Sequence, residues 1–200
     1  MRKLHVTVID LVVKAPTTRM YGCIMNANAA SIMPQVIALW CEQEGHDVDF
    51  ICYTGKENLF AELPDDTDVV FVGAFSQAGQ LSYAISNYMR SKGAVTVLGG
   101  PHARSYPQDA QKYFDYVLDF TDRELIRDVL QDCSETRPLG VHLAANGQPT
   151  HLPGVKERWK YIEIVLEKAP LIKTVAMMGS FGCPYTCNFC IDAAIPYQPL

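Results

Sequence analysis

The sequence predicts a doubly wound α/β domain built on a five-stranded parallel sheet. Short apolar segments with strand-like alternation recur along the first 133 residues, and amphipathic helical segments lie between them. Consecutive parallel strands need crossover connections, and right-handed helical crossovers place helices on both faces of the sheet. The chain has 200 residues, 48% of them hydrophobic, so it is long enough to bury the core that this fold requires.

The five expected strands are rich in apolar and β-branched residues and are bounded by turn formers. They cover residues 4–10, 47–53, 68–74, 94–98 and 116–119. The stretch after the first strand is rich in Ala, Asn and Thr, and it predicts an irregular connection as far as Ser31. Gly99, Gly100 and Pro101 close the fourth strand with a tight turn.

Helical periodicity separates these strands. Residues 32–40 carry apolar side chains on one face, and Gly45 stands where a C-terminal cap is expected. Short helices are expected over residues 57–63 and from about Pro107. The clearest helix has apolar residues at i, i+3, i+4, i+7 and i+8, which are Leu81, Ala84, Ile85, Tyr88 and Met89.

The last helix of this domain begins with a predicted capping box. Thr121 is the expected N-cap, and Glu124 follows three residues later. This helix completes the fifth β/α unit, so the domain covers residues 1–133. Residues 134–154 are dense in Pro, Gly and Asn, and they predict a linker.

A second unit covers residues 155–200. Its helix is predicted from apolar residues on one face, which are Trp159, Ile162, Val165 and Leu166. A strand is expected over residues 172–178, and it runs directly into a loop with three cysteines. We expect the chain to be a fragment of a longer protein, because it ends ten residues after Cys190.

Composition and charge exclude several functional classes. The net charge is -5 at pH 7, and Lys and Arg form no cluster of the kind that binds nucleic acid or an anionic membrane. No apolar stretch approaches the roughly 20 residues that span a bilayer. The first apolar segment is interrupted by His5 and Asp10 and lacks a cleavage site, so we expect it to be a first strand rather than a signal peptide. We expect a cytoplasmic protein with a small-molecule substrate.

Three of the seven cysteines stand close together, at Cys183, Cys187 and Cys190, with the spacing CxxxCxxC. Three thiolates select zinc, copper(I) or an iron–sulfur cluster. A four-iron cluster has four ligand positions, so three cysteines leave one iron free to bind another group. The alternatives are a zinc knuckle with His151 as fourth ligand and a disulfide. The other cysteines are expected to be small buried residues: Cys23, Cys41, Cys52 and Cys133.

The cysteine loop resembles the cluster-binding motif of the radical S-adenosylmethionine superfamily. Cys183, Cys187 and Cys190 match it in spacing, and the aromatic Phe189 stands immediately before the last cysteine. The resemblance implies that the cysteines bind a 4Fe-4S cluster, that Phe189 takes part in cofactor binding, and that S-adenosylmethionine chelates the open iron. It also implies reductive cleavage of S-adenosylmethionine to a 5′-deoxyadenosyl radical, with electrons from a flavodoxin or ferredoxin. The strand over residues 172–178 would then begin a (β/α) barrel.

The first domain resembles the flavodoxin-like or Rossmann-like cobalamin-binding domain that many radical S-adenosylmethionine proteins carry at the N-terminus. The resemblance lies in the third and fourth strands with their loops, residues 69–76 and 96–103. It implies that Gly99 and Gly100 allow close approach of a flat ligand and that Ser76 hydrogen-bonds a nucleotide tail. The pairing of the two domains implies an enzyme for methyl transfer or rearrangement on an unactivated carbon.

Two features depart from the cobalamin-binding pattern. Asp10 is followed by residues 11–13, Leu-Val-Val, so the histidine of a DxHxxG motif is missing. Residues 119–124 read DFTDRE where relatives have Gly-Glu-Gly-Glu, and only Glu124 matches. We therefore expect the dimethylbenzimidazole of any bound cobalamin to be displaced from cobalt and buried along the sheet edge. The alternative function is a non-catalytic cobalamin or small-ligand binding module with a structural zinc knuckle.

Overall fold

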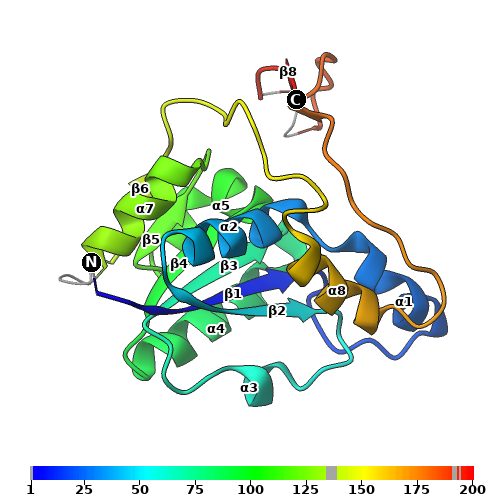
Figure 1. The fold of residues 1–200 in the computed structure, drawn as a ribbon, viewed down its shortest axis with the longest axis horizontal. Helices are drawn as coiled ribbons and strands as arrows, with labels where there is room; N and C mark the ends of the chain where they lie inside the picture. The colour runs from blue at the N-terminus through cyan, green and yellow to red at the C-terminus, as the bar shows by residue number, and fades with distance from the viewer. Residues whose placement is uncertain (1, 134–138, 191–192, 194) are drawn as a thin grey trace.

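The computed structural model describes residues 2–133, 139–190, 193 and 195–200. Its main sheet is parallel throughout and has the strand order β2-β1-β3-β4-β5-β6 (Figure 1). The strands are β1 His5–Leu11, β2 Asp47–Tyr53, β3 Val69–Ala74, β4 Val95–Gly99, β5 Tyr116–Leu118 and β6 Val141–Leu143. Because β2 and β3 lie on opposite sides of β1, the winding direction reverses at β1. The predicted α/β class is confirmed.

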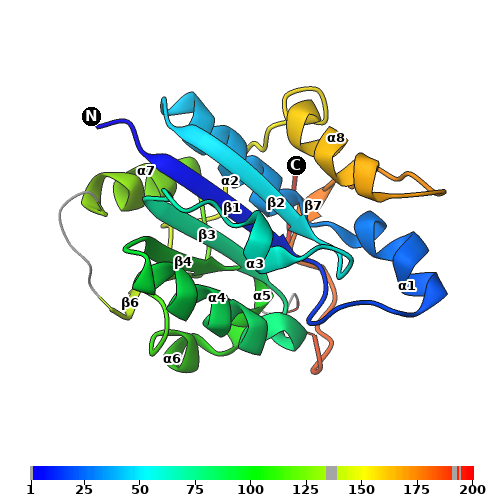
Figure 2. The ribbon, with the colours of Figure 1, turned by 90° about the horizontal axis from the view of Figure 1, so that it is seen from below.

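Helices cover both faces of the sheet (Figures 1 and 2). One core contains residues of α2 Ile32–Gln43, α7 Arg123–Asp132 and α8 Trp159–Lys168. The other contains residues of α3 Leu59–Glu62, α4 Gly79–Ser91, α5 Pro101–Ser105 and α6 Pro107–Ala110. Side chains of β1 alternate between the two, since Val6 and Val8 belong to the first core and Ile9 and Leu11 to the second.

The main sheet has six strands, so the prediction of a five-stranded sheet is wrong. The sixth strand, β6, lies within residues 134–154, which the turn formers marked as a linker, and it pairs with β5. This pairing covers an edge of β5 whose backbone groups would otherwise lack strand partners. None of the three residues of β6 is fully buried, and turn formers surround them. Such a strand carries too little apolar alternation to be recognised in the sequence.

The start of α7 also differs from the prediction. Its N-cap is Asp122, whose Oδ1 accepts a hydrogen bond from the amide of Leu125 at 2.8 Å. The hydroxyl of Thr121 donates instead to the carbonyl oxygen of Asp119 at 3.2 Å. The helix therefore begins one residue later than the capping-box pattern predicts, because an aspartate is an equally good N-cap.

The connection between β1 and α2, predicted to be irregular, contains two short helical segments. These are α1 Met20–Met25 and the 3-10 turn η1 Asn26–Ala29. No residue of α1 is buried, so no apolar face marks this helix in the sequence. Among the described residues no single helix is long and apolar enough to cross a membrane, although α1 and η1 together with α2 form a bent pair that passes on length and composition alone.

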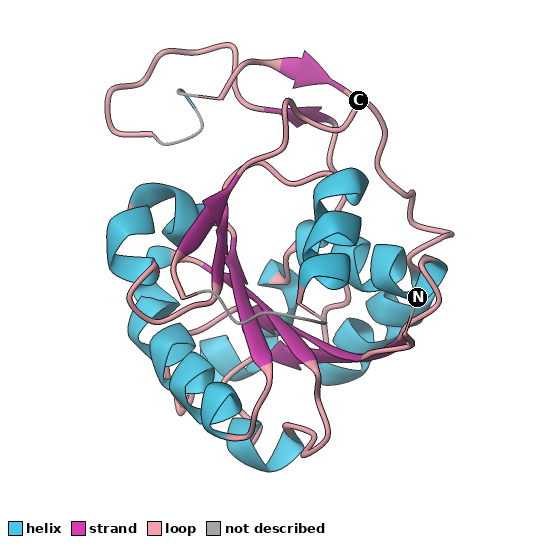
Figure 3. Cartoon of the chain, turned by 90° about the vertical axis from the view of Figure 1, so that its left-hand side faces the viewer, coloured by secondary structure: helices cyan, strands magenta, loops and turns pink. Residues whose placement is uncertain are grey.

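The C-terminal segment beyond α8 lies outside the main sheet (Figure 3). Residues 172–178 form no strand, so the strand predicted there is wrong for this structure. A strand needs a hydrogen-bonded neighbour, and no described strand pairs with these residues. The strands that do form are short and antiparallel, β7 Ser180–Phe181 and β8 Gln198–Pro199.

A buried arginine ties this segment to the α/β body. Arg158 is 3% exposed, and its Nε donates to the carbonyl oxygen of Pro153 at 3.0 Å. Its guanidinium also donates to Oε1 of Gln35 on α2 and, at 3.5 Å, to the carbonyl oxygen of Ala176. These bonds join α2, the segment before α8 and the segment that leads to the cysteines.

Candidate functional site

The parallel strands end at one edge of the main sheet, and a cavity of about 330 Å³ lies there. It is lined by the ends of β3, β4 and β5 and by the first turn of α2. Residues 148–149, after β6, and residues 180–182, after α8, also line it. Doubly wound sheets bind ligands at this edge, where the winding direction reverses. The volume falls at the small end of the range for small-molecule pockets.

The lining of the cavity is largely apolar, with one paired charge. Its charged residues are Arg104 and Asp119, and Nε of Arg104 donates to Oδ1 of Asp119 at 2.8 Å. The guanidinium carbon of Arg104 also lies 4.8 Å from the centre of the Phe120 ring. The ion pair leaves the described lining with no net charge.

One polar atom of the lining has no partner. Oε1 of Gln148 is buried and accepts no hydrogen bond from the described residues. The amide nitrogen of the same side chain donates to the carbonyl oxygen of Pro196 at 3.3 Å. Buried acceptors are nearly always satisfied in folded proteins, so a bound group or an ordered water belongs beside Gln148.

Of the residues predicted to bind cobalamin, the structure brings Gly99 and Gly100 to the cavity. A Cβ at Gly99 would have no atom within 4 Å, so this position opens onto free space. Gly100 has a φ of +91°, and a Cβ there would lie 3.1 Å from the carbonyl oxygen of Ala74. Ser76, in the 3-10 turn η2 Ser76–Ala78, is exposed and does not line the cavity.

Asp10, the next-to-last residue of β1, is buried near this edge. It is 1% exposed, and its Oδ2 accepts a hydrogen bond of 2.6 Å from the amide of Ser31, which itself lines the cavity. Burial raises the pKa of Asp10 to about 7, although the bond from Ser31 opposes the rise. No histidine is among the described residues that line the cavity.

The three loop cysteines are accessible, with Cys187 exposed and Cys183 and Cys190 half-buried. The amide of Cys190 donates to the carbonyl oxygen of Cys187 at 3.1 Å. Within the described part of the chain, no three His, Cys, Asp or Glu side chains are grouped closely enough to hold a metal ion. The donor chemistry suits iron or zinc, and such a loop would have to close around the metal for its thiols to converge.

The cysteine loop starts at the cavity. Gly182 lines the cavity and immediately precedes Cys183. It has a φ of +62°, and a side chain there would collide with the carbonyl oxygen of Ile195. Phe189 is 92% exposed and does not line the cavity. The structure therefore joins the start of the loop to the sheet edge and leaves Phe189 in solvent.

The scattered cysteines follow the prediction in part. Cys41 and Cys52 are buried, whereas Cys23 and Cys133 are half-buried. All seven cysteines carry free thiols, so the structure contains no disulfide of the kind considered for the loop.

Two further histidines, one of them the His151 considered as a zinc ligand, lie away from the cavity. His102, in α5, is 6% exposed, and its Nε2 lies 2.8 Å from the hydroxyl of Tyr83, which also donates to Asp109 at 3.0 Å. Burial lowers the pKa of His102, and the residue does not line the cavity. His151 is exposed in a separate open hollow beside Trp40, and it joins no group of metal ligands among the described residues.

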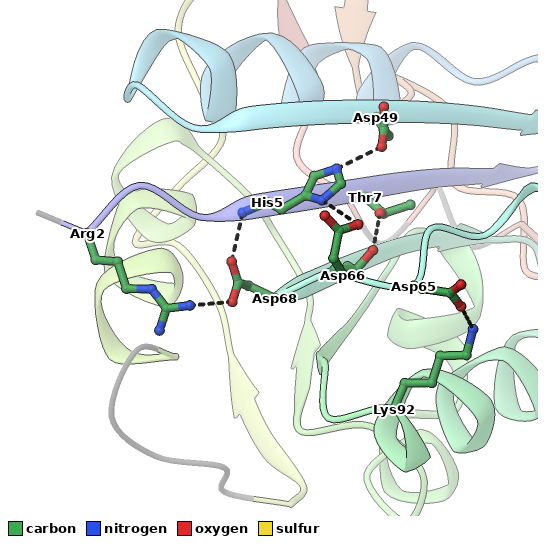
Figure 4. Close-up of polar contacts among 9 residues, drawn as sticks. Arg2, His5, Thr7, Asp49, Asp65, Asp66, Asp68 and Lys92 are labelled. Atoms are coloured by element: carbon green, nitrogen blue, oxygen red, sulfur yellow. Dashed lines mark hydrogen bonds and ion pairs between the residues drawn. The ribbon is translucent and has the colours of Figure 1, made fainter.

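The opposite edge of the sheet carries a network of paired charges (Figure 4). Nε2 of His5 lies 2.8 Å from Asp49, and its Nδ1 lies 3.1 Å from Asp66. Arg2 forms an ion pair of 2.7 Å with Asp68, whose second oxygen accepts the amide of His5 at 2.9 Å. These carboxylates are all paired with a nearby cation, histidine or backbone amide.

Sequence reasoning missed Gln148 and Arg104. Gln148 stands in the turn-rich stretch predicted as a linker, and nothing in its sequence surroundings marks it. Arg104 follows the Gly-Gly-Pro turn, and its position after that turn was an available signal. No protein-family model matches the chain, and no curated protein matches it in sequence. A functional assignment therefore depends on the motifs and on the geometry of this edge.

Proposed function

We propose that the chain belongs to a radical S-adenosylmethionine enzyme with an N-terminal cobalamin-binding domain, acting in methyl transfer or rearrangement on an unactivated carbon. The observation that carries the proposal is the position of the CxxxCxxC loop. It begins at Gly182, which lines the cavity at the ligand-binding edge of the sheet. A cluster on this loop and a ligand in the cavity would be neighbours.

The cluster would be held by the thiolates of Cys183, Cys187 and Cys190. With S-adenosylmethionine on its open iron, a 4Fe-4S cluster supplies the electron for reductive cleavage of that cofactor. The exposure of Cys187 leaves the loop free to fold around the metal. Residues 155–200 would then be the start of the barrel.

Cobalamin fits the sheet edge in part. A cavity of about 330 Å³ is too small for a whole corrinoid and takes a group of the size of its nucleotide base. Gly99 leaves space for that group, and Gly100 permits the turn that brings β4 close to Ala74. The DxHxxG histidine is missing after Asp10, so the base of a bound cobalamin would be displaced from cobalt without a histidine in its place.

A non-catalytic small-ligand module with a zinc knuckle is the second candidate. The observation that favours it is that the cavity is formed in the structure and that none of the three loop cysteines is among its described lining residues, so a small ligand can bind there without cluster chemistry. The two candidates differ in the metal that the loop takes, iron with sulfide or zinc alone.

The test is anaerobic reconstitution with iron and sulfide, followed by metal and sulfide analysis. We expect about four iron and four sulfide ions per chain, with absorption at about 400 nm. Cluster binding should be abolished in each of Cys183→Ala, Cys187→Ala and Cys190→Ala. Cys23→Ala is the matched control, because Cys23 is a half-buried cysteine outside the loop. Retention of the cluster in a loop variant, or purification of the chain with stoichiometric zinc, would contradict the radical enzyme.

A further inference from the structure

We propose that the sheet-edge cavity binds a neutral, planar heteroaromatic group that donates a hydrogen bond to Gln148, as the amino group of an aminopurine does. The inference rests on the proposed ligand site at this edge and is independent of the cysteine loop. Three properties of the described lining carry it: an acceptor without a partner among the described residues, the absence of net charge, and a small volume beside Gly99.

The acceptor is Oε1 of Gln148, and its orientation is fixed. The amide nitrogen of Gln148 donates to the carbonyl oxygen of Pro196 at 3.3 Å. Turning the amide would bring two carbonyl oxygens together, so Oε1 keeps its place as a buried acceptor. A bound group without a donor would leave this oxygen unpaired, at the cost of a buried polar atom. The ligand is therefore expected to carry an N–H or amino group.

The charge of the lining selects a neutral group. Among the described lining residues, Arg104 and Asp119 are the charged ones, and they pair at 2.8 Å. A phosphate or carboxylate inside the cavity would meet the carboxylate of Asp119 as well as the guanidinium of Arg104. A neutral ring avoids that repulsion and can stack on the apolar lining.

The size and the donor requirement distinguish between bases. About 330 Å³ suits a bicyclic ring, and the open space at Gly99 leaves room for it. The dimethylbenzimidazole of cobalamin carries its ribose on nitrogen and has no N–H left to donate. A purine with an amino group, in a nucleoside or as the base of a corrinoid, can satisfy Gln148.

Calorimetric titration with two matched probes tests the inference. 9-Methyladenine carries the amino donor, and 9-methylpurine differs only in lacking it. We expect 9-methyladenine to bind roughly tenfold more tightly to the native chain, which is the effect of one hydrogen bond to a buried acceptor. In Gln148→Leu this preference should disappear. Circular dichroism of each variant establishes that it is folded.

A steric variant provides the second arm. In Gly99→Val the new side chain starts in open space at the cavity, so the fold should persist while both probes lose binding at least tenfold. Gly147→Val is the matched control, because Gly147 also has free space around it and does not line the cavity. Loss of binding in the control alone, or unchanged binding in Gly99→Val, would place the ligand elsewhere.

The remaining outcomes separate this inference from the proposed function. Equal binding of the two probes to the native chain overturns the donor requirement, and tighter binding of adenosine monophosphate than of adenosine overturns the neutral ligand. If neither purine binds while hydroxocobalamin is retained, the inference fails and the cobalamin proposal stands. If the purine binds and hydroxocobalamin does not, the inference stands and cobalamin is removed from the proposed function. Failure of both ligands overturns both.

Discussion

The ionisable side chains at the two ends of β1 differ in burial and in charge pairing. At the amino end, His5 lies between Asp49 and Asp66 in a partly exposed network of charge pairs (Figure 4). At the carboxyl end, Asp10 is fully buried, and among the described residues it has no cationic partner. Paired charges suit an edge that meets solvent, whereas the carboxyl edge combines a buried carboxylate without a cation, the unpartnered Oε1 of Gln148 and the cavity.

The largest expected effect concerns Asp10. Its pKa is raised by burial to about 7 in the folded chain, from an ordinary value near 3.8. The unfolded chain therefore loses its proton first, and the contribution of Asp10 to the free energy of unfolding falls as the pH rises from about 4 to about 7. Between about pH 4 and about pH 7, we expect the free energy of unfolding of Asp10→Asn to rise by on the order of 3 to 4 kcal/mol relative to that of the native chain.

Urea unfolding of both chains between about pH 4 and pH 8 measures this difference. The comparison removes the contributions of other carboxylates, because they are the same in the two chains. Asparagine keeps an oxygen that accepts the amide of Ser31, so the backbone contact is preserved. A difference that stays constant with pH would show that Asp10 is solvated and that the two ends of β1 do not differ in this way.

A smaller effect distinguishes two adjacent glycines at the carboxyl edge. Gly100→Ala should lower the free energy of unfolding by about 1 to 2 kcal/mol, because its φ is +91° and the new Cβ would press on Ala74. Gly99→Ala should change it by less than about 0.5 kcal/mol, because the new methyl enters open space. Chemical denaturation of the two variants gives the comparison, and equal losses would mean that Gly99 faces packed atoms rather than a cavity.

The smallest effect is expected at the amino edge. Partial burial lowers the pKa of His5, but the hydrogen bond to Asp49 and the charges of Asp66 and Asp49 together raise it above 6.5. The stabilisation by the His5 cation is therefore complete at low pH and is lost as the pH rises from about 6.5 through the raised value. His5→Gln should cost less than about 1 kcal/mol at pH 5 and almost nothing at pH 9. If the loss of free energy of unfolding in His5→Gln grew with pH, the pKa of His5 would be lowered rather than raised by folding.

The sequence predicted the parts of the molecule that depend on local periodicity. Alternation located the strands β1 to β5, and helical spacing located α2 and α4. It did not show β6, because Val141–Leu143 is short and only partly buried. Gln148 and Arg104 were missed for a different reason. The cavity combines segments that are distant in sequence, so its unpaired acceptor is visible only once the chain is folded.

The later start of α7 and the absent strand show how local patterns compete with each other and with tertiary context. Thr121 and Glu124 form a capping-box pattern, but Asp122 is an equally good N-cap one residue later and takes that position in the structure. Residues 172–178 have the composition of a strand, and composition alone supplies no hydrogen-bond partner. The cysteine loop is a similar case. The spacing of its cysteines predicts metal ligands, but a metal ion is needed to bring the thiols together.

The central claim is that the carboxyl edge of the sheet, and not the amino edge, is the ligand-binding edge. Proton–nitrogen correlation spectra of the chain, titrated with hydroxocobalamin and with 9-methyladenine, test it most directly. We expect chemical-shift changes concentrated on the amides of Gly73, Gly99 and Gly100, which line the cavity, with Thr7 and Asp68 unchanged. Shifts centred on Thr7 and Asp68, or no shifts with either ligand, would contradict the account.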